Sequence, residues 1–266
     1  MDDQKFRNLL DVFGLSWEGY RRIRKGVKKR IRRHMQQLKC PSVESYLLTL
    51  EQSQDLRQEC ELLLTVSISR FFRDRVLWNT LENQIIPSIM MKNRDSLKVW
   101  SAGCACGEEV YSFKIIWEES KSVAENLPKL DLWATDMNPL YLDKARSGRY
   151  PRSSLREVPE KIRSVYFESQ KGGKEYEVMP FLKENIVWEL HHLLSEPPAS
   201  DFHLIFLRNN LLTYYDERLA VPAFQKIVES LAPNGYLIIG SHENLPPSAS
   251  HLTLTGGVPY LFHHER

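Results

Sequence analysis

Apolar residues change their spacing near residue 90 of this 266-residue chain. Before that point they recur at intervals of three and four, the period of an amphipathic helix, and no convincing strand is present. From Leu97 onward, short apolar runs alternate with helical stretches. That alternation is typical of an α/β fold. The pattern therefore predicts a helical N-terminal part followed by an α/β part.

The α/β part contains six short apolar runs that we interpret as strands. They are Leu97–Ala102, Leu130–Thr135, Ile186–Leu190, His203–Leu207, Tyr236–Gly240 and, late in the chain, Pro259–His263. The helical stretches between them include Glu108–Glu118, Leu140–Ser147 and Glu217–Leu231. The sequence Pro233-Asn234-Gly235 predicts a turn between the last of these helices and the next strand. Helical connections between successive strands favour a mainly parallel sheet with helices on both faces.

One predicted helix of the N-terminal part is strongly basic. Its apolar stripe consists of Ile23, Val27, Ile31, Met35 and Leu38. Around this stripe lie nine cations without an acid among them: Arg21, Arg22, Arg24, Lys25, Lys28, Lys29, Arg30, Arg32 and Arg33. One interpretation is a solvated helix surface, and the other is a docking surface for an acidic protein partner, because the cations repel one another. Few aromatic residues interleave with them, so we expect no nucleic-acid partner.

The composition of the chain indicates the cell compartment in which we expect the protein. The start of the chain, Met1–Leu10, is too polar for a secretory signal, and no apolar run is long enough to span a bilayer, so we expect no membrane insertion. Four cysteines are too few and too unevenly spaced for a disulfide framework. A reduced, cytoplasmic protein is therefore expected. Cys104 and Cys106 have no second ligand cluster nearby, so we expect no metal site.

The segment after the first predicted strand combines small residues with acids. Gly103 to Gly107 lead directly into a predicted helix that begins with Glu108 and Glu109. Small residues let a backbone turn sharply and approach a ligand closely. Carboxylates would repel the pyrophosphate of a dinucleotide, whereas they attract the ammonium and sulfonium of S-adenosylmethionine. The alternative for one of these acids is a simple first-turn position, which the helix dipole favours.

Polar residues also follow the second and fourth predicted strands. Asp136 stands at the end of the second strand, where a carboxylate can accept hydrogen bonds from both ribose hydroxyls. An N-cap for the next helix is the alternative role. The fourth strand runs into the polar and aromatic segment Arg208–Asp216. Because ligands bind at the carboxyl edge of such sheets, these features predict an S-adenosylmethionine-dependent methyltransferase.

Taken together, these segments resemble the CheR chemotaxis methyltransferases, a family that methylates glutamate side chains of bacterial chemoreceptors. The resemblance extends over nearly the whole chain. Its most specific segments are Ser69–Asp74, Gly103–Ser112, Ala134–Asp136, Lys144–Tyr150, Arg208–Asp216 and Gly240–Asn244. It implies a helical domain at residues 1–75, a linker helix at 76–95 and a Rossmann-like methyltransferase domain at 96–266.

The resemblance also implies the cofactor and the roles of individual residues. S-adenosylmethionine is the expected cofactor and S-adenosylhomocysteine the product. Glu108 would contact the amino group of the cofactor and Asp136 its ribose. Arg73 would lie close to the methyl-transfer centre, and Tyr214 would be the second catalytic residue. The remaining residues expected at the cofactor are Ser67, Ser69, Gly103, Met137, His192, Leu193, Asn209 and Asn210.

Several features depart from the family pattern near the catalytic edge. His192 stands where the family usually has an adenosine-contacting amide. The run from Arg208 to Tyr214 is one residue longer than usual, so either Asn209 or Asn210 faces the pocket. Residues 166–187 resemble the position of a small β-subdomain with which some members grip a receptor tail. The basic helix resembles the family's receptor-docking surface.

Three functions are consistent with the sequence. The first is methylation of receptor glutamates, which need no general base because a carboxylate is ionised at neutral pH. The enzyme then aligns the acceptor with the methyl group and excludes water. The second is methylation of a small carboxylate, thiol or other metabolite. The third is a regulatory module that binds the cofactor with little catalysis, and the acids and Arg73 argue against it.

Overall fold

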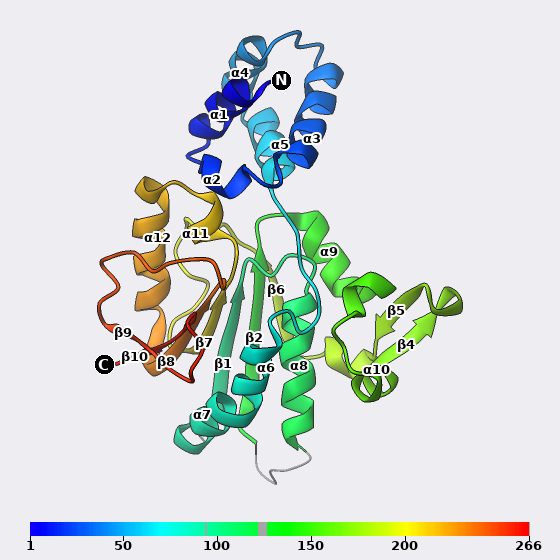
Figure 1. Cartoon of the computed structure of the whole chain (residues 1–266), viewed down its shortest axis with the longest axis vertical. Helices are drawn as coiled ribbons and strands as arrows, with labels where there is room; N and C mark the ends of the chain where they lie inside the picture. The colour runs from blue at the N-terminus through cyan, green and yellow to red at the C-terminus, as the bar shows by residue number, and fades with distance from the viewer. Residues whose placement is uncertain (94, 122–126, 266) are drawn as a thin grey trace. The chain divides into compact units, whose positions relative to one another are not determined.

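A computed structural model describes residues 1–93, 95–121 and 127–265 and divides the chain into two compact units (Figure 1). Unit 1 comprises Met1–Val66 and Asn209–Pro222, and unit 2 comprises Ser67–Arg208 and Ala223–Arg266. Residue 94 of the predicted linker helix lies outside the described residues, as do residues 122–126 and 266 of the predicted methyltransferase domain. Helix α12 (Glu217–Glu229) has its first residues in unit 1 and the others in unit 2.

Unit 1 is helical throughout its described secondary structure. Its helices are α1 (Asp3–Val12), α2 (Trp17–Tyr20), α3 (Arg24–Gln37), α4 (Val43–Glu51), α5 (Gln54–Leu64) and α11 (Leu211–Tyr214). Four of them begin at a residue whose side chain caps the helix: Asp2, Ser42, Ser53 and Asn210 each accept a hydrogen bond from a backbone N–H of the first turn. The predicted apolar stripe of α3 faces the core through its buried residues Val27, Ile31 and Met35.

Unit 2 is built on a seven-stranded sheet with the order β6-β2-β1-β7-β8-β10-β9. The strands are β1 (Ser96–Ala102), β2 (Lys129–Asp136), β6 (Ile186–Leu190), β7 (Phe202–Leu207), β8 (Leu231–Ile239), β9 (Leu252–Leu254) and β10 (Leu261–His264). The first five in the sheet order are parallel, and β10 is antiparallel to both of its neighbours. This sheet and the helices of unit 1 confirm the predicted α/β fold class with a helical N-terminal part.

The predicted strands are all present, but two details differ. The strand β9 is only three residues long, too short for its apolar pattern to be recognised in the sequence. The predicted turn at Pro233 to Gly235 lies inside β8, where the register against β7 shifts and Asn234 has a φ of 60°. Because β8 continues through this irregularity, it begins at Leu231, before the predicted turn. The preceding helix therefore ends at Glu229 and not at the predicted Leu231.

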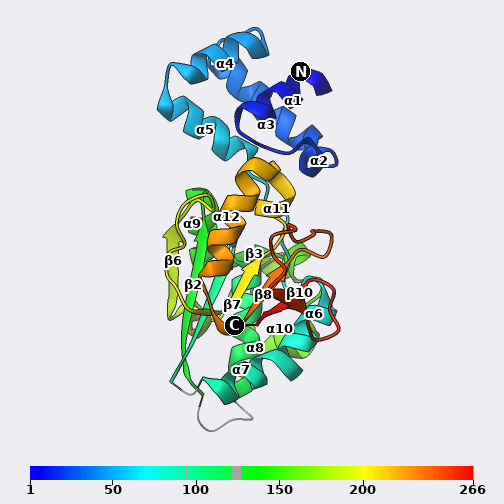
Figure 2. The same cartoon turned by 90° about the vertical axis from the view of Figure 1, so that its left-hand side faces the viewer.

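Helices cover the sheet on the side that carries the larger core (Figure 2). They are α6 (Arg75–Thr80), the π-helical segment η1 (Leu81–Ile85), α7 (Ile86–Lys92) and α8 (Glu108–Lys121). Their apolar side chains form one buried cluster with Val99 of β1, Leu132 of β2 and Phe206 of β7. Because side chains alternate along a strand, Trp100 faces the opposite side, where it stacks on Phe202 at 5.2 Å between ring centroids.

A second, antiparallel sheet has the strand order β3-β5-β4. It consists of β3 (Arg149–Pro151), β4 (Phe167–Gln170) and β5 (Glu175–Val178), with α9 (Pro139–Ser147), α10 (Glu160–Tyr166) and the 3-10 turns Arg152–Leu155, Lys171–Gly173 and Pro180–Lys183 around it. It lies beside α8 in Figure 1, and Tyr166 donates a hydrogen bond to Glu119 of that helix at 2.5 Å. Two of its strands fall within residues 166–187. Across the described part of the chain, no helix is long and apolar enough to cross a membrane.

Candidate cofactor-binding site

The loop between β1 and α8 is fixed to the end of β2 by backbone hydrogen bonds. The N–H groups of Gly103 and Cys104 donate to the carbonyl of Thr135 at 2.9 and 2.8 Å. Gly107, the last loop residue, has a φ of +87°, and a Cβ there would lie 2.9 Å from Cβ of Ala145 and 3.1 Å from the hydroxyl of Tyr150. Only glycine combines this conformation with this close approach. The loop therefore has a defined shape at the carboxyl edge of the sheet, where ligands bind.

Asp136 lies beneath this loop, at the end of β2. Its carboxylate is 9% exposed and accepts the N–H groups of Ala105 and Asn138, each at 2.9 Å. Burial raises the pKa of this carboxyl, and these backbone hydrogen bonds oppose the rise. The N-cap of α9 is Asn138, whose side chain accepts the N–H of Leu140, so the alternative that Asp136 caps this helix is wrong. A carboxylate has about four acceptor positions, and the N–H groups of Ala105, Asn138 and Met137 take three of them, so Asp136 keeps capacity for a ribose hydroxyl.

Glu108 is buried in the first turn of α8, with 5% of its surface exposed. Its Oε1 accepts a hydrogen bond from Ser154 at 3.5 Å, whereas its Oε2 is buried without a hydrogen-bond partner among the described residues. Burial raises the pKa of this carboxyl, and its own backbone N–H, the charge of Lys144 and the nearby hydroxyl of Ser69 oppose the rise. An unpaired buried carboxylate oxygen is costly unless a cation meets it. The site therefore fits the ammonium of an amino-acid ligand.

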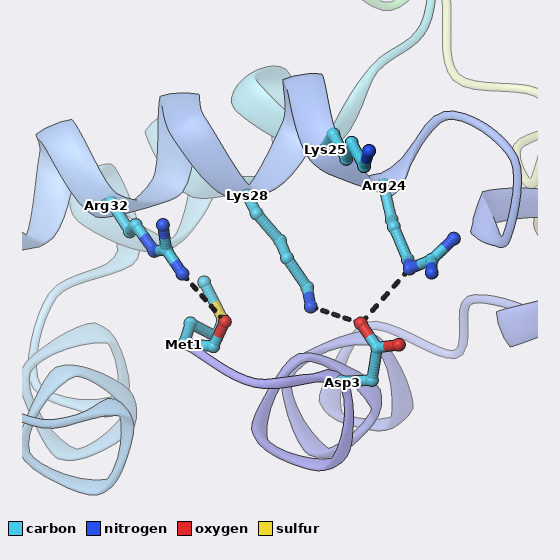
Figure 3. Close-up of a pocket in the computed structure, with 6 residues that line it drawn as sticks. All are labelled: Met1, Asp3, Arg24, Lys25, Lys28 and Arg32. Carbon is cyan, nitrogen blue, oxygen red and sulfur yellow. Dashed lines mark hydrogen bonds and ion pairs between the residues drawn. The ribbon is translucent and has the colours of Figure 1, made fainter.

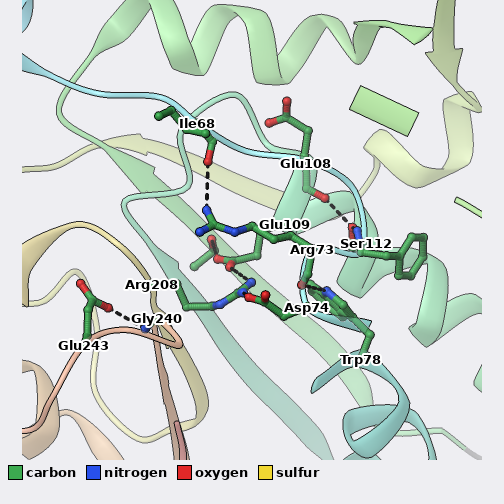
Figure 4. Close-up of polar contacts among 12 residues, drawn as sticks. Ile68, Arg73, Asp74, Trp78, Glu108, Glu109, Ser112, Arg208, Gly240 and Glu243 are labelled. Carbon is green, nitrogen blue, oxygen red and sulfur yellow. Dashed lines mark hydrogen bonds and ion pairs between the residues drawn. The ribbon is translucent and has the colours of Figure 1, made fainter. Parts of the chain in front are cut away.

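Arg73 lies on a tight turn between two anchored segments (Figure 4). The residues on either side, Phe72 and Asp74, have φ values of 51° and 66°, a region that non-glycine residues rarely occupy. Phe72 is held by burial and by its N–H, which donates to Ser112 of α8 at 2.9 Å. The guanidinium of Arg73 donates to the carbonyl of Ile68 at 3.1 Å. Two strained positions around one side chain are typical of a functional turn.

The segment before this turn also contacts the loop. The hydroxyl of Ser67 lies 3.5 Å from the sulfur of Cys106, and the hydroxyl of Ser69 lies close enough to Glu108 to lower the pKa of its carboxyl. The fold therefore brings two further predicted residues together with Gly103, Glu108 and Asp136.

Other predicted residues follow the neighbouring strands of unit 2. The backbone of Met137 hydrogen-bonds to Asp136. His192 and the half-buried Leu193 follow β6, which pairs with β2, and Nδ1 of His192 accepts the N–H of Leu194 at 3.1 Å. After β8, the carboxylate of Glu243 accepts the N–H of Gly240 at 2.5 Å (Figure 4).

The segment that follows β7 passes into unit 1 after Arg208. Asn209 has a φ of 55°, and the side chain of Asn210 accepts the N–H of Leu211 at the start of α11. The ring of Tyr214 packs edge-on against Tyr20 at 5.1 Å between centroids. The cofactor roles of Asn209 and Asn210 and the catalytic role of Tyr214 stay predictions.

Sequence reasoning assigned no role to several residues that the fold brings to the loop. Ser154 reaches Glu108, and the hydroxyl of Tyr150 donates to the carbonyl of Cys106 at 2.6 Å. Tyr150 belongs to one of the motif segments, whereas Ser154 lies in a stretch without any motif. Their roles depend on the packing of the segment after α9, which no local pattern reveals.

The two cysteines of the loop are not part of a metal site among the described residues. Cys104 is buried, and burial raises the pKa of its thiol. Within the ranges that the structure describes, no three histidine, cysteine or acidic side chains gather as a metal site.

The basic helix α3 is partly neutralised by an acid that is distant in sequence (Figure 3). Arg24 and Lys28 both form ion pairs with Asp3 of α1, and Arg30 donates to two backbone carbonyls. A hollow of about 310 Å³ is lined by Met1, Asp3, Arg24, Lys25, Lys28 and Arg32. Four exposed cations of α3 and the turn before it have neither an ion pair nor a hydrogen bond in the described part of the chain: Arg22, Lys25, Lys29 and Arg33.

Comparisons with known proteins bear on this site. The family model described as "CheR methyltransferase, SAM binding domain" matches residues 67–260. The chain is 32% identical over 219 residues to a chemotaxis protein methyltransferase of Listeria monocytogenes, with 82% of this chain and 81% of the relative covered. A chemotaxis protein methyltransferase of Listeria innocua is 33% identical with the same coverage. One from Borreliella burgdorferi is 30% identical, with 75% of this chain and 73% of the relative covered.

Proposed function

The chain belongs to the CheR methyltransferase family, and we propose that it transfers the methyl group of S-adenosylmethionine to glutamate carboxylates of a chemoreceptor. Family membership confirms the predicted enzyme class, an S-adenosylmethionine-dependent methyltransferase, and its cofactor. The proposal itself concerns three features: the acceptor, the residues that act on it and the docking surface.

The observation that carries the proposed site is the unpaired, buried Oε2 of Glu108. When bound, S-adenosylmethionine supplies a methyl group that its sulfonium already activates. Glu108 would hold the ammonium of the cofactor, and Asp136 would hold its ribose. Both carboxylates are fixed by hydrogen bonds before a ligand arrives, Glu108 by Ser154 and Asp136 by the backbone N–H groups of Ala105, Asn138 and Met137. Such preorganisation reduces the cost of binding.

Arg73 is the residue that we propose orients the acceptor. A glutamate carboxylate is already ionised at neutral pH, so the chain has to place it in line with the methyl group rather than remove a proton. Across the described residues, the guanidinium of Arg73 makes one hydrogen bond, to Ile68. A guanidinium has five N–H donors, so the others are available for a carboxylate.

The exposed cations Arg22, Lys25, Lys29 and Arg33 support docking on an acidic protein surface. Their charges have no ion pair within the described chain, so an acidic partner gains from meeting them. A chemoreceptor is the partner that the names of the curated relatives favour. A cytoplasmic location belongs to the same proposal and is supported by the four cysteines, which are all free. The small sheet β3-β5-β4 is a second candidate for receptor contact.

The acceptor is tested with methyl-labelled S-adenosylmethionine, the purified protein and a fractionated extract of cells that naturally contain it, followed by mild base. Labelled methanol released from a membrane-protein band supports glutamate methylation of a receptor. Label confined to the small-molecule fraction contradicts the receptor and identifies a metabolite acceptor. Label in neither fraction contradicts both acceptors. The variant Glu108→Gln is the control that shows that transfer depends on this protein's cofactor site.

A further inference from the structure

Arg208, the residue after β7, lies at the centre of a buried ionic cluster (Figure 4). Only 6% of its side chain is exposed. Its Nη1 donates to Oε2 of Glu109 at 3.1 Å, and its Nη2 donates to Oδ2 of Asp74. One guanidinium therefore joins two segments that are far apart in the sequence, the turn of Arg73 and the first turn of α8.

Each partner of Arg208 is the immediate neighbour of a residue in the proposed site. Asp74 follows Arg73, and its side chain does not cap α6, so its carboxylate is available to Arg208. Glu109 follows Glu108, and its other oxygen accepts a hydrogen bond from Ser101 of β1 at 2.8 Å. The link therefore runs from the turn of Arg73 through Arg208 to the start of α8 and the sheet beneath it.

The chemistry of the cluster favours a geometric role over a stabilising one. Buried ion pairs contribute little net stability, because desolvation of the charges offsets their attraction. Nε of Arg208 is also buried without a hydrogen-bond partner among the described residues, which adds a further cost. A guanidinium is rigid and planar, so its N–H donors fix the relative positions of two carboxylates. A lysine ammonium does not fix them in this way.

We propose that Arg208 is a positioning residue that holds the Arg73 turn at a fixed place relative to Glu108. The inference rests on the proposed roles of Arg73 and Glu108, which face acceptor and cofactor. Displacement of the turn would move the guanidinium of Arg73 away from the acceptor, whereas Glu108 and Asp136 would keep their own hydrogen bonds. Small displacements of an orienting group lower the rate of the chemical step strongly.

The test uses Arg208→Gln, Asp74→Asn and the double variant of the full chain. We expect each single variant to lower kcat for labelling of the membrane fraction at least about tenfold, because misplacement by about 1 Å costs up to about a hundredfold. The dissociation constant of S-adenosylhomocysteine, measured by calorimetry, should change less than about threefold, since a threefold change is below 1 kcal/mol. The double variant should be no worse than Arg208→Gln, because both changes break one link. Arg146→Gln, which removes an exposed ion pair with Asp143, is the matched control.

A second readout needs no acceptor. The indole N–H of Trp78 donates to the carbonyl of Arg73 at 2.7 Å, so its NMR signal, one of six from the tryptophans of the chain, reports the position of the turn. It should shift in Arg208→Gln and Asp74→Asn and stay unchanged in Arg146→Gln. If wild-type protein labels no receptor, the proposed acceptor fails, but this signal still decides whether Arg208 fixes the turn.

Arg208→Gln leaves two partly buried carboxylates, with 24% and 14% of their side chains exposed, without their cation and could unfold the chain. The triple variant Arg208→Gln, Asp74→Asn and Glu109→Gln removes the repulsion between these carboxylates. It should therefore keep the fold but lack the guanidinium that joins the two segments. A folded neutral variant with low kcat, near-normal cofactor affinity and a shifted Trp78 signal supports the positioning role. An unchanged Trp78 signal, equal losses in kcat and affinity, or full activity of the neutral variant would overturn it.

Discussion

Glu108 combines a cost to the fold with a proposed benefit to cofactor binding, because its buried carboxylate has an oxygen without a hydrogen-bond partner among the described residues. Burial raises its pKa above the ordinary 4.5. Only the ionised form attracts an ammonium, so affinity for S-adenosylhomocysteine should fall as the pH falls through this raised pKa. Glu108→Gln should weaken binding at pH 7 by at least about tenfold, because a charge-assisted hydrogen bond contributes about 1.5–3 kcal/mol. Calorimetry over pH 5–8 measures both effects. If the variant lost affinity for S-adenosylhomocysteine more steeply at acid pH than wild type does, the role of Glu108 would be contradicted.

The same substitution should stabilise the ligand-free chain. A carboxyl whose pKa is raised on folding takes up a proton more readily in the folded state, so its ionisation destabilises the fold above that pKa. Glu108→Gln should therefore raise Tm at pH 7 by about 2–4 °C, which is the effect of about 1 kcal/mol in a chain of this size. Differential scanning calorimetry is the measurement. Glu168→Gln, at an exposed position of β4, is the control and should leave Tm unchanged.

Arg73 should act on the rate rather than on cofactor affinity. Its guanidinium has one hydrogen bond within the described chain, so Arg73→Ala removes few contacts that hold the fold. We expect methyl transfer to fall at least about a hundredfold, and the dissociation constant of S-adenosylhomocysteine to change much less, as for the loss of a transition-state contact. Single-turnover transfer and calorimetry separate the two quantities. Equal losses in both would contradict the orienting role.

At the scale of elements, the loop before α8 depends on one backbone conformation. Gly107→Ala would introduce a Cβ at a φ of +87° that lies 2.9 Å from Ala145. The conformation costs about 1–2 kcal/mol and the crowding about 1–3 kcal/mol more, so unfolding by denaturant should show a loss of about 2–5 kcal/mol. The affinity of this variant for S-adenosylhomocysteine should fall as well.

Gly172→Ala separates these two costs. Gly172 has a φ of +65°, but a Cβ there would meet nothing within 4 Å. It should therefore lose only the conformational part, about 1–2 kcal/mol, and keep cofactor affinity. Equal losses of stability and affinity in the two variants would contradict the assignment of the Gly107 loop to the cofactor.

Most elements of the large sheet were predictable because each of them is a local pattern. The strand β1, for example, is a largely buried apolar run, and α8 begins where small residues give way to Glu108. The strand β9 and the start of β8 were not, because a three-residue strand and a register shift leave no periodic signal. The small sheet was recognised only by position, since its strands are three or four residues long and separated by turns.

The contacts of the candidate site were less predictable than its motif residues. Glu108 and Asp136 follow strands, so their place at the sheet edge could be inferred from topology. The bridge of Arg208 to Asp74 joins residues 134 positions apart, and only the completed fold brings them together. The partner of Lys28 was missed in the same way, because Asp3 lies on another helix of unit 1. The number of cations in a stretch of sequence therefore overstates how many surface charges lack an ion-pair partner.

At the scale of the whole molecule, the proposed docking on the acceptor depends on the cations of α3 that have no ion pair among the described residues. Lys25 and Lys29 are exposed and have no ion pair in the described chain. Lys25→Gln with Lys29→Gln should raise KM for the receptor about fivefold, if each exposed charge contributes about 0.5 kcal/mol. The kcat and the affinity for S-adenosylhomocysteine should not change, because docking precedes the chemical step.

The matched control makes the same change of net charge elsewhere. Lys92 and Lys129 are exposed lysines of unit 2, and their substitution by glutamine should leave KM unchanged. Added salt should reduce the difference between wild type and the α3 variant, because at 1 M the screening length falls to about 3 Å. Receptor labelling at several salt concentrations gives both results. If both double variants raise KM equally, long-range net charge explains the effect and α3 is not the docking surface; if neither does, the cations of α3 belong to a solvated helix face.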